Sequence, residues 1–153
     1  NGSNLNTEKK NFIKNAVTYF GSQCIVISID IINLGDGFAI YDYNKKQNLK
    51  INIKEFMNKV QSLEIGEIII TDVSRDGCKE GFDKIYLDQI KDLIKVPLVI
   101  SGGCSNFNDF LFAFNILKAD GVASGTFFSQ HDQSVFQTKN HLSDKGVPIR
   151  LDH

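Results

Sequence analysis

Three apolar stretches of the sequence each stop at polar residues that could carry chemistry. In chain order they end on Asp30, on Thr71-Asp72 with the turn that follows, and on Ser101-Gly102-Gly103. Short runs of β-branched residues that stop at a polar turn are typical of buried parallel strands. Because parallel strands end at the same edge of a sheet, we expect these groups at one rim, as in enzymes of the α/β class.

Asp30 is the candidate acid or base. A carboxylate that ends an otherwise apolar strand is partly desolvated, which suits it to proton transfer. Asp76, beside Arg75 in the turn after the second stretch, is a further candidate. A structural interpretation stays open for both: Asp30 as a helix cap or ion-pair partner, and Asp76 as a turn residue paired with Gly77.

Two glycine-containing turns are candidate phosphate sites. Gly102-Gly103 follows a predicted strand and precedes a predicted helix, and Gly125-Thr126 follows the last predicted strand. Glycines let backbone N–H groups approach a phosphate closely, and a helix N-terminus adds a partial positive charge. The alternative is that the glycines only form turns. Two such turns on adjacent strands favour phosphate, because barrel loops after the last two strands frequently share one.

The composition argues against several classes of protein. With 153 residues, 42% of them hydrophobic, the chain can form one domain or part of a larger one. A formal net charge of -1 gives no electrostatic case for a nucleic-acid partner or for an acidic membrane surface. No apolar run approaches the roughly 18 residues that a membrane helix needs. No signal peptide is recognisable at the start, so the cytoplasm is the expected compartment.

No metal site is expected. The residue types most often found on metals are Cys24, Cys78, Cys104, His131, His141 and His153. The cysteines have no metal-type spacing, and an odd number without a C-x-x-C pair fits reduced thiols. The histidines do not cluster with cysteines or carboxylates, so we interpret them as surface residues. No organic cofactor is implied either.

The periodicity of apolar residues predicts an alternation of helices and strands. Helices are expected over residues 8–20, 53–63, 87–94, 106–117 and 135–145, and strands over 24–30, 67–72, 98–101 and 121–124, with a short hairpin over 38–43 and 49–51. Strands about 30 residues apart with helices between them predict right-handed βαβ crossovers and a parallel sheet. Four strands cannot close a barrel but eight can, so residues 1–153 are expected to form one half-barrel domain.

Short motifs along the chain carry a family resemblance. They are Phe20-Gly21-Ser22-Gln23 leading to Ser28-Ile29-Asp30, Gly66-Glu67-Ile68, Arg75-Asp76-Gly77, Gly81-Phe82-Asp83, Ser101-Gly102-Gly103 and Ala119-Asp120-Gly121. Together they make the sequence resemble the cyclase subunit of imidazole glycerol phosphate synthase, in its second half. The resemblance implies strands five to eight of a (β/α)8 TIM barrel, with the active site at the carboxyl ends of the strands.

The resemblance also implies roles for individual residues. Asp30 matches the general acid of the cyclisation, on strand five. Asn6 and Thr7 match the end of strand four, which helps to bind one substrate phosphate. The positions that match the pocket lining and the cradle for the other phosphate are Thr71, Asp76, Gly77, Ser101, Gly102, Gly103, Gly125 and Thr126.

The implied reaction belongs to histidine biosynthesis. Ammonia made from glutamine by a separate glutaminase subunit passes through the barrel. It combines with a bisphosphorylated ribotide, which this lyase-type cyclase cleaves and cyclises to imidazole glycerol phosphate. No metal or organic cofactor takes part in this implied reaction.

Departures from the family pattern keep other functions open. The first half-barrel is missing, and with it a second catalytic Asp on strand one. Ser74 stands where the family usually has Asp, and Asp72 where it usually has a small hydroxyl residue. The ending over residues 137–151 is more similar to a branch that delivers ammonia for amidination of a surface-polysaccharide sugar. A further alternative is an inactive phosphate-binding half-barrel that recruits its other half or self-associates through unpaired sheet edges.

Overall fold

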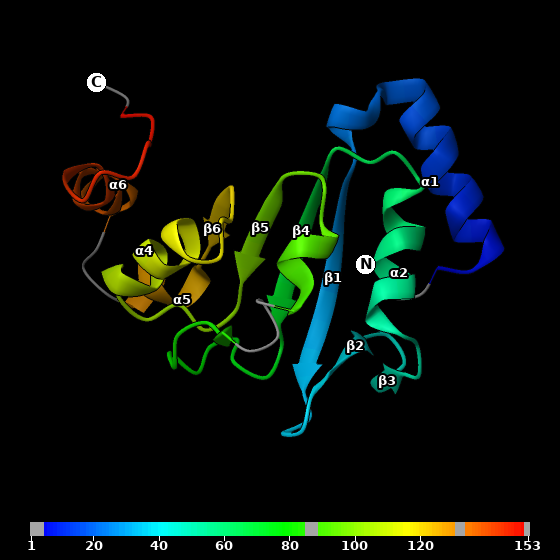
Figure 1. The fold of residues 1–153 in the computed structure, drawn as a ribbon, viewed down its shortest axis with the longest axis horizontal. Coiled ribbons are helices and arrows are strands. Elements are labelled where there is room, and N and C mark those ends of the chain that lie inside the picture. Colours follow the sequence, from blue (N-terminus) through cyan, green and yellow to red (C-terminus); the bar gives the residue numbers. More distant parts are fainter. Residues whose placement is uncertain (1–4, 85–88, 131–133, 152–153) are drawn as a thin grey trace.

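A six-stranded sheet organises the computed structural model, which describes residues 5–84, 89–130 and 134–151 (Figure 1). The strands are β1 (Val26–Asn33), β2 (Phe38–Asp42), β3 (Gln47–Leu49), β4 (Glu67–Asp72), β5 (Leu98–Ser101) and β6 (Gly121–Ala123). Their order across the sheet is β3-β2-β1-β4-β5-β6. The runs of β-branched residues in β1, β4 and β5 suit a pleated surface that is buried on at least one face.

Four of these strands form a parallel unit, and two add to its edge. The strands β1, β4, β5 and β6 are parallel neighbours, as predicted. The predicted hairpin is also confirmed, but β2 pairs antiparallel with Ile31, Ile32 and Asn33 of β1, and β3 pairs with β2. The sequence did not predict that this hairpin extends the edge of the parallel sheet. A mixed, mostly parallel sheet is compatible with part of a barrel.

The helices other than α5 lie close to the predicted ranges. They are α1 (Thr7–Phe20), α2 (Ile53–Gln61), α4 (Phe107–Asn115), α5 (Gly125–Gln130) and α6 (Val135–Asp144), with the short 3-10 helices η1 (Ser22–Cys24) and η2 (Lys91–Leu93). Capping boxes start α4 and α6, built by Asn106 with Asp109 and by Ser134 with Gln137. Such boxes satisfy N–H groups that a helix start otherwise leaves without partners.

Two predicted segments differ from the structure in detail. The helix expected over residues 87–94 falls partly on residues 85–88, which lie outside the described part of the chain. Of its remainder, Gln89 and Ile90 are helical and lead into η2. Gly125-Thr126 was expected to form a turn, but it begins α5. Phe127 of this helix packs edge-on against Phe110 of α4, and this tertiary contact has no counterpart in local sequence signals.

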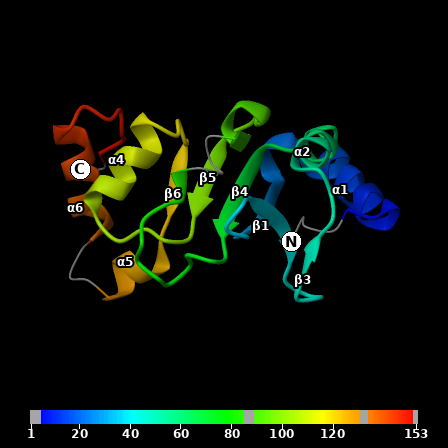
Figure 2. The ribbon, with the colours of Figure 1, turned by 60° about the horizontal axis from the view of Figure 1, so that its bottom comes forward.

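Burial alternates along the parallel strands and defines two faces of the sheet. One face carries a core of buried isoleucines, including Ile29, Ile31, Ile70 and Ile100, and α2 packs its buried Phe56 into the same core. The residues between these isoleucines are only half-buried. In Figure 2, α1 and α2 group beside β1, whereas α4 and α6 group beyond β6. Because α2 covers the isoleucine face, the half-buried face is the open one.

None of the helices in the described ranges combines the length and the apolar character that crossing a bilayer requires.

Candidate functional site

A row of small polar side chains crosses the open face of the sheet. In the register of the parallel strands, Asp30 pairs with Thr71, Thr71 with Ser101, and Ser101 with Ala123. Residues opposite one another in a parallel pair point to the same face, so the carboxyl and the two hydroxyls lie side by side. All three polar residues are half-buried. The strand ends thus bring together groups that lie far apart in the sequence.

The sequence suggested that Asp30 ends its strand, but the structure shows that it does not. β1 continues through Ile31 and Ile32 to Asn33. The parallel pairing with β4 ends at the Ile31–Asp72 partners, and the extra residues pair with β2 instead. The carboxylate therefore projects from the wall of the sheet, next to its carboxyl-end rim.

Gly102 and Gly103, which follow β5, allow close backbone contact with the end of β4 and the loop after it. Gly102 has φ +87°, and a Cβ atom there would lie 2.4 Å from the backbone oxygen of Asp72. Gly103 has φ +108°, and its Cβ would lie 2.3 Å from the backbone oxygen of Gly81. The Gly81 N–H donates to the Gly103 oxygen over 2.8 Å. Only glycine allows this backbone-to-backbone approach.

Gly125 and Thr126 sit at the same end of the sheet, one strand further along. They follow β6 directly and open α5. A Cβ atom at Gly125 would meet nothing within 4 Å, so neither φ nor crowding requires glycine there. The space beside Gly125 is open, in contrast to the crowded surroundings of Gly102.

A polar network holds the loop that follows β4. The Ser74 hydroxyl accepts from the Asn33 N–H over 2.8 Å, and the Asn33 side-chain amide donates to Asp83 over 2.6 Å. Arg75 donates to the backbone oxygens of Glu80 and Gly81 over 3.1 and 3.2 Å. Its guanidinium also lies 3.7 Å from Asp83 Oδ2. Hydrogen bonds thus hold the loop both to Asn33 at the end of β1 and within its own residues.

Arg75 and Asp83 are residues whose roles the sequence did not reveal. Their partners are backbone oxygens and side chains of other segments, so no local spacing signals the network. The only sequence signal is an arginine placed in a Gly- and Asp-rich turn.

Asp72 does not belong to the row of Asp30, Thr71 and Ser101, because its side chain points to the helix-covered face. Its side chain is fully buried, and its Oδ1 accepts from the Ser74 N–H over 2.9 Å. Its Oδ2 has no hydrogen-bond partner among the described residues and lies 3.9 Å from Arg75 Nε. Burial raises the pKa of Asp72, and the bonds from Ser74 and the charge of Arg75 oppose this only in part. Thr71 and Asp72 therefore do not line one pocket.

Asp76 and Gly77 lie exposed on the loop after β4. The Asp76 N–H donates to the backbone oxygen of Asp72 over 3.0 Å, so a turn fixes the position of this residue. Gly77 has φ +77°, a conformation that glycine adopts readily. The carboxyl group of Asp76 stays accessible to solvent.

Asn6 and Thr7 start a helix, and the strand that they were expected to end would run through residues 1–4, which lie outside the described part of the chain. Thr7 is the first residue of α1, and Asn6 is its N-cap, with its side chain accepting from the Lys9 N–H over 2.9 Å. Both residues are exposed. An Asn side chain that can satisfy a free N–H group at a helix start explains why the helix begins there.

The histidines do not form a metal site in the described part of the chain. There, no three side chains of His, Cys, Asp or Glu are arranged to hold a metal ion. His141 is half-buried and stacks on Phe107 with ring centroids 4.6 Å apart, so its interpretation as a surface residue is wrong. His131 and His153 lie outside the described residues.

Comparison with known proteins gives a consistent family match. The family described as "Histidine biosynthesis protein" matches residues 3–135. The imidazole glycerol phosphate synthase subunit HisF of Chloroherpeton thalassium is 35% identical over 132 residues, which cover 86% of this chain and 53% of the relative. HisF of Methanocaldococcus jannaschii is 30% identical over 161 aligned positions, which cover 92% of this chain and 59% of the relative. The chain thus spans a little over half the length of these curated relatives.

Proposed function

The chain belongs to the histidine biosynthesis protein family, and we propose that it supplies one half of an imidazole glycerol phosphate synthase cyclase. In this proposal residues 1–153 form the half-barrel domain with strands five to eight. The four parallel strands β1, β4, β5 and β6 correspond to those four strands. The remaining length of the relatives supplies the rest of the barrel.

The observation that carries the proposal is the register of Asp30, Thr71 and Ser101. It aligns one carboxyl and two hydroxyls on the open face, directly beside the rim that holds Gly102-Gly103. An acid group next to an anion-binding rim suits a reaction that moves protons on a phosphorylated substrate. The fold alone, which hosts many chemistries, would not support this conclusion.

Asp30 is the proposed general acid of the cyclisation. It projects from the sheet wall, where the side chains of Ser28 and Ile32 flank it on the same face. Such half-burial limits competing water while leaving the carboxyl open to a substrate. Thr71 and Ser101 line the pocket beside Asp30, Asp76 lines it from the loop after β4, and Gly77 of the same loop belongs to the phosphate cradle.

The rim binds the phosphates of a bisphosphorylated ribotide. Gly102, Gly103, Gly125 and Thr126 hold one phosphate through backbone N–H groups, and the open space beside Gly125 leaves room for it. Asn6 and Thr7 at the start of α1 help to hold the other. A separate glutaminase subunit supplies the ammonia, in keeping with the relatives being subunits of a synthase.

Delivery of ammonia for sugar amidination gains no support from the structure. The ending over residues 137–151 favoured this alternative, and Ser74 kept it open. The Ser74 hydroxyl accepts a hydrogen bond from Asn33, so the serine has a structural task that is independent of the reaction. The cyclase is therefore the function that we propose.

The test is cyclisation with free ammonia. The chain is combined with the part of the C. thalassium relative that it does not cover, and turnover of the bisphosphorylated ribotide is measured for wild type and Asp30→Asn. Asp36→Asn, in the exposed turn after β1, is the matched control. Activity in wild type and Asp36→Asn that is lost in Asp30→Asn supports the proposal, and equal turnover in all three proteins removes Asp30 from its role.

A further inference from the structure

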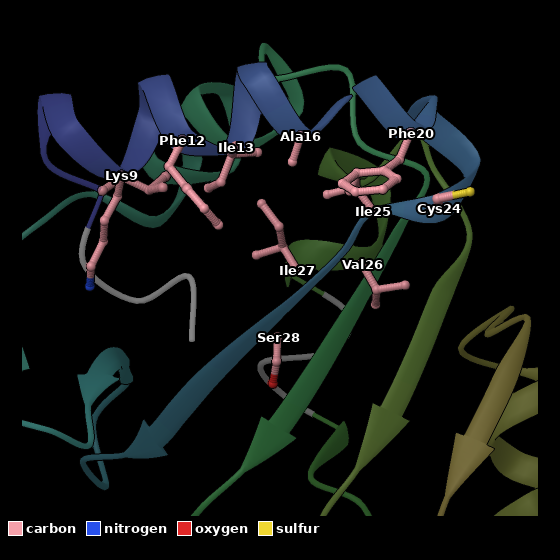
Figure 3. A pocket seen from close by; sticks show the side chains of 11 residues that line it. Lys9, Phe12, Ile13, Ala16, Phe20, Cys24, Ile25, Val26, Ile27 and Ser28 are labelled. Atoms are coloured by element: carbon pink, nitrogen blue, oxygen red, sulfur yellow. The ribbon is translucent and has the colours of Figure 1, made fainter. Parts of the chain in front are cut away.

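Two loops meet at the carboxyl ends of the parallel strands. β4 and β5 run in the same direction, so the loop after β4 and the Gly102-Gly103 turn after β5 lie at the same end of the sheet (Figure 1). The groove of about 530 Å³ between α1 and β1 has a different character. Figure 3 shows Phe12, Ile13 and Phe20 pointing from α1 into this groove, and its walls are mostly apolar. The groove offers an anion few donors, whereas the two loops offer several.

The Gly103 N–H is a buried donor that has no acceptor among the described residues. The parallel pairing of β4 with β5 stops at the Thr71–Ser101 partners, two residues before Gly103. The next backbone oxygen of β4, that of Asp72, accepts from two N–H groups of the loop after β4. Buried backbone N–H groups nearly always have a partner, so a donor left over at a strand end indicates a place for a bound acceptor.

Gly81, at the far end of the loop after β4, fixes the Gly103 peptide. The Gly81 N–H donates to the Gly103 oxygen over 2.8 Å, and the Gly81 oxygen lies so close that only a glycine fits opposite it. That same oxygen accepts from the guanidinium of Arg75 over 3.2 Å. The orientation of the Gly103 peptide therefore depends on where Arg75 holds Gly81.

Two buried carboxylates hold the Arg75 guanidinium in turn. Its Nε lies 3.9 Å from Asp72 Oδ2, and its Nη2 lies 3.7 Å from Asp83 Oδ2. Its Nη1 donates to the backbone oxygens of Glu80 and Gly81. A planar guanidinium can make several such contacts at once in a fixed geometry, which a lysine cannot. The side chain is 26% exposed, so it faces the protein far more than it faces a ligand.

We propose that Arg75 is a positioning residue of the phosphate site. It holds the Gly81 carbonyl, and Gly81 fixes the Gly103 N–H as a donor to one phosphate of the substrate. The inference rests on the proposed function for the identity of the anion, and it adds a residue that does not itself touch the phosphate. A donor that is already oriented before binding loses little conformational freedom when the ligand arrives, so Arg75 strengthens phosphate binding from a distance.

Two other roles of Arg75 lead to different observations. If Arg75 bound phosphate directly, its replacement would weaken binding but leave the Gly81–Gly103 contact of the free chain unchanged. If Arg75 only stabilised the loop, its replacement would lower the free energy of unfolding but not the affinity of the folded chain for phosphate. A positioning role changes both the contact in the free chain and the affinity.

The experiment titrates the purified chain with inorganic phosphate. Amide NMR spectra of the isotope-labelled chain follow the Gly103 N–H signal, and hydrogen exchange reports the protection of the Gly81 N–H. We expect phosphate to shift the Gly103 signal of wild type. In Arg75→Gln the Gly81 N–H should exchange faster even without phosphate. The dissociation constant should rise about tenfold, the low end of what removal of a residue that orients a ligating group costs in metal sites. Arg75→Lys, which keeps a charged donor, should fall between the two.

Arg150→Gln and Ser74→Ala are the matched controls. Arg150 is the other arginine of the sequence and is exposed, so Arg150→Gln removes the same charge from a different place. Ser74→Ala removes the acceptor of the Asn33 N–H, so it loosens the same loop without touching Gly81. We expect both variants to bind phosphate as wild type does, although Ser74→Ala should lower the midpoint of urea denaturation.

A Gly103 signal that phosphate does not shift, or equal affinity of wild type and Arg75→Gln, overturns the inference. So does an equal loss of affinity in either control, and so does weaker binding with unchanged protection of Gly81. In the assembled cyclase, Arg75→Gln should raise KM for the ribotide and leave kcat nearly unchanged. Phosphate binding that depends on Arg75, without cyclisation by the assembled protein, refutes the proposed function alone.

Discussion

Asp30 and Thr71 stand opposite each other in the parallel register of β1 and β4, and both side chains point to the open face of the sheet. The pairing places a hydroxyl beside the carboxyl that we propose as the general acid. Ser101 continues the line on β5. An acid flanked by hydroxyls on a rigid sheet is held more firmly than one on a loop.

Replacement of this pair should have coupled effects on catalysis. In the assembled cyclase, Asp30→Asn should lower turnover by about 10²- to 10⁴-fold, the usual contribution of a general acid. Thr71→Val removes the neighbouring hydroxyl and should have a smaller effect. If both residues act on one substrate group, Thr71→Val should cost less in the Asp30→Asn background. Steady-state kinetics of the four proteins measure this, and strictly additive effects contradict a shared role.

Gly102→Ala should destabilise the fold. The φ of +87° alone costs a non-glycine residue about 1–3 kcal/mol, and a Cβ atom 2.4 Å from the Asp72 oxygen adds a steric clash. Urea denaturation followed by circular dichroism gives the free energy of unfolding. Gly37→Ala is the control, because its φ is ordinary and a Cβ there meets nothing within 4 Å. Equal stability of both variants would mean that the ends of β4 and β5 do not approach closely.

Arg75→Gln should destabilise the loop after β4 by about 1–3 kcal/mol, since two backbone acceptors then lose a charged donor. Those acceptors are the oxygens of Glu80 and Gly81, with the buried carboxylates of Asp72 and Asp83 nearby. In the Asp83→Asn background the same change should cost less, because one carboxylate no longer needs the cation. Chemical denaturation of the four proteins at neutral pH tests this, and identical costs in both backgrounds would exclude an interaction between Arg75 and Asp83.

Asp72 predicts a specific pH dependence of stability. Its pKa is raised in the folded chain above the ordinary value of 3.8, so the folded state binds this proton more tightly than the unfolded state. The free energy of unfolding of wild type should therefore rise relative to Asp72→Asn as the pH falls through the raised pKa. The gain is complete below 3.8. Denaturation midpoints of both proteins across this range measure the difference, and a constant difference contradicts the prediction.

The three thiols should differ in reactivity. Cys24 and Cys78 are exposed, whereas Cys104 is buried and burial raises the pKa of its thiol to about 12. Because the thiolate is the reactive form, iodoacetamide at pH 8 should modify two cysteines of the folded chain and the third only in denaturant. Peptide mass spectrometry identifies the modified residues. Rapid labelling of Cys104 in the folded chain would show that its site is open to solvent.

The positions of the parallel strands were predictable because their residues are β-branched and end at polar turns. Glu67–Asp72 and Leu98–Ser101 agree with the sequence to the residue. The first strand was predicted to begin two residues too early and to end three residues too early. Asp30 looked like its end, but Ile31 and Ile32 continue the strand because the hairpin supplies them with a partner. Pairing with a distant segment leaves no mark in the local pattern.

The grouping of Thr71 with Asp72 illustrates what the two-residue period of a strand can decide. Adjacent residues of a strand point to opposite faces, so only one of the two can share a face with Asp30. The pairing of Asp30 with Thr71 selects Thr71. Which partner stands opposite Asp30 depends on the register between strands, which the sequence does not specify locally. The network of Arg75 and Asp83 was unpredictable for the same reason.

The short hairpin after β1 also sets a limit that concerns assembly. Because β2 occupies the outer edge of β1 from Ile31 onward, only residues 26–30 of that edge remain open for pairing with another strand. That length corresponds to about 16 Å of strand. A segment that slides too far along the edge collides with Ile40, the partner of Ile31, and with the rest of the hairpin. The hairpin thus limits how far another strand can shift along this edge, and it disfavours pairing in the wrong register.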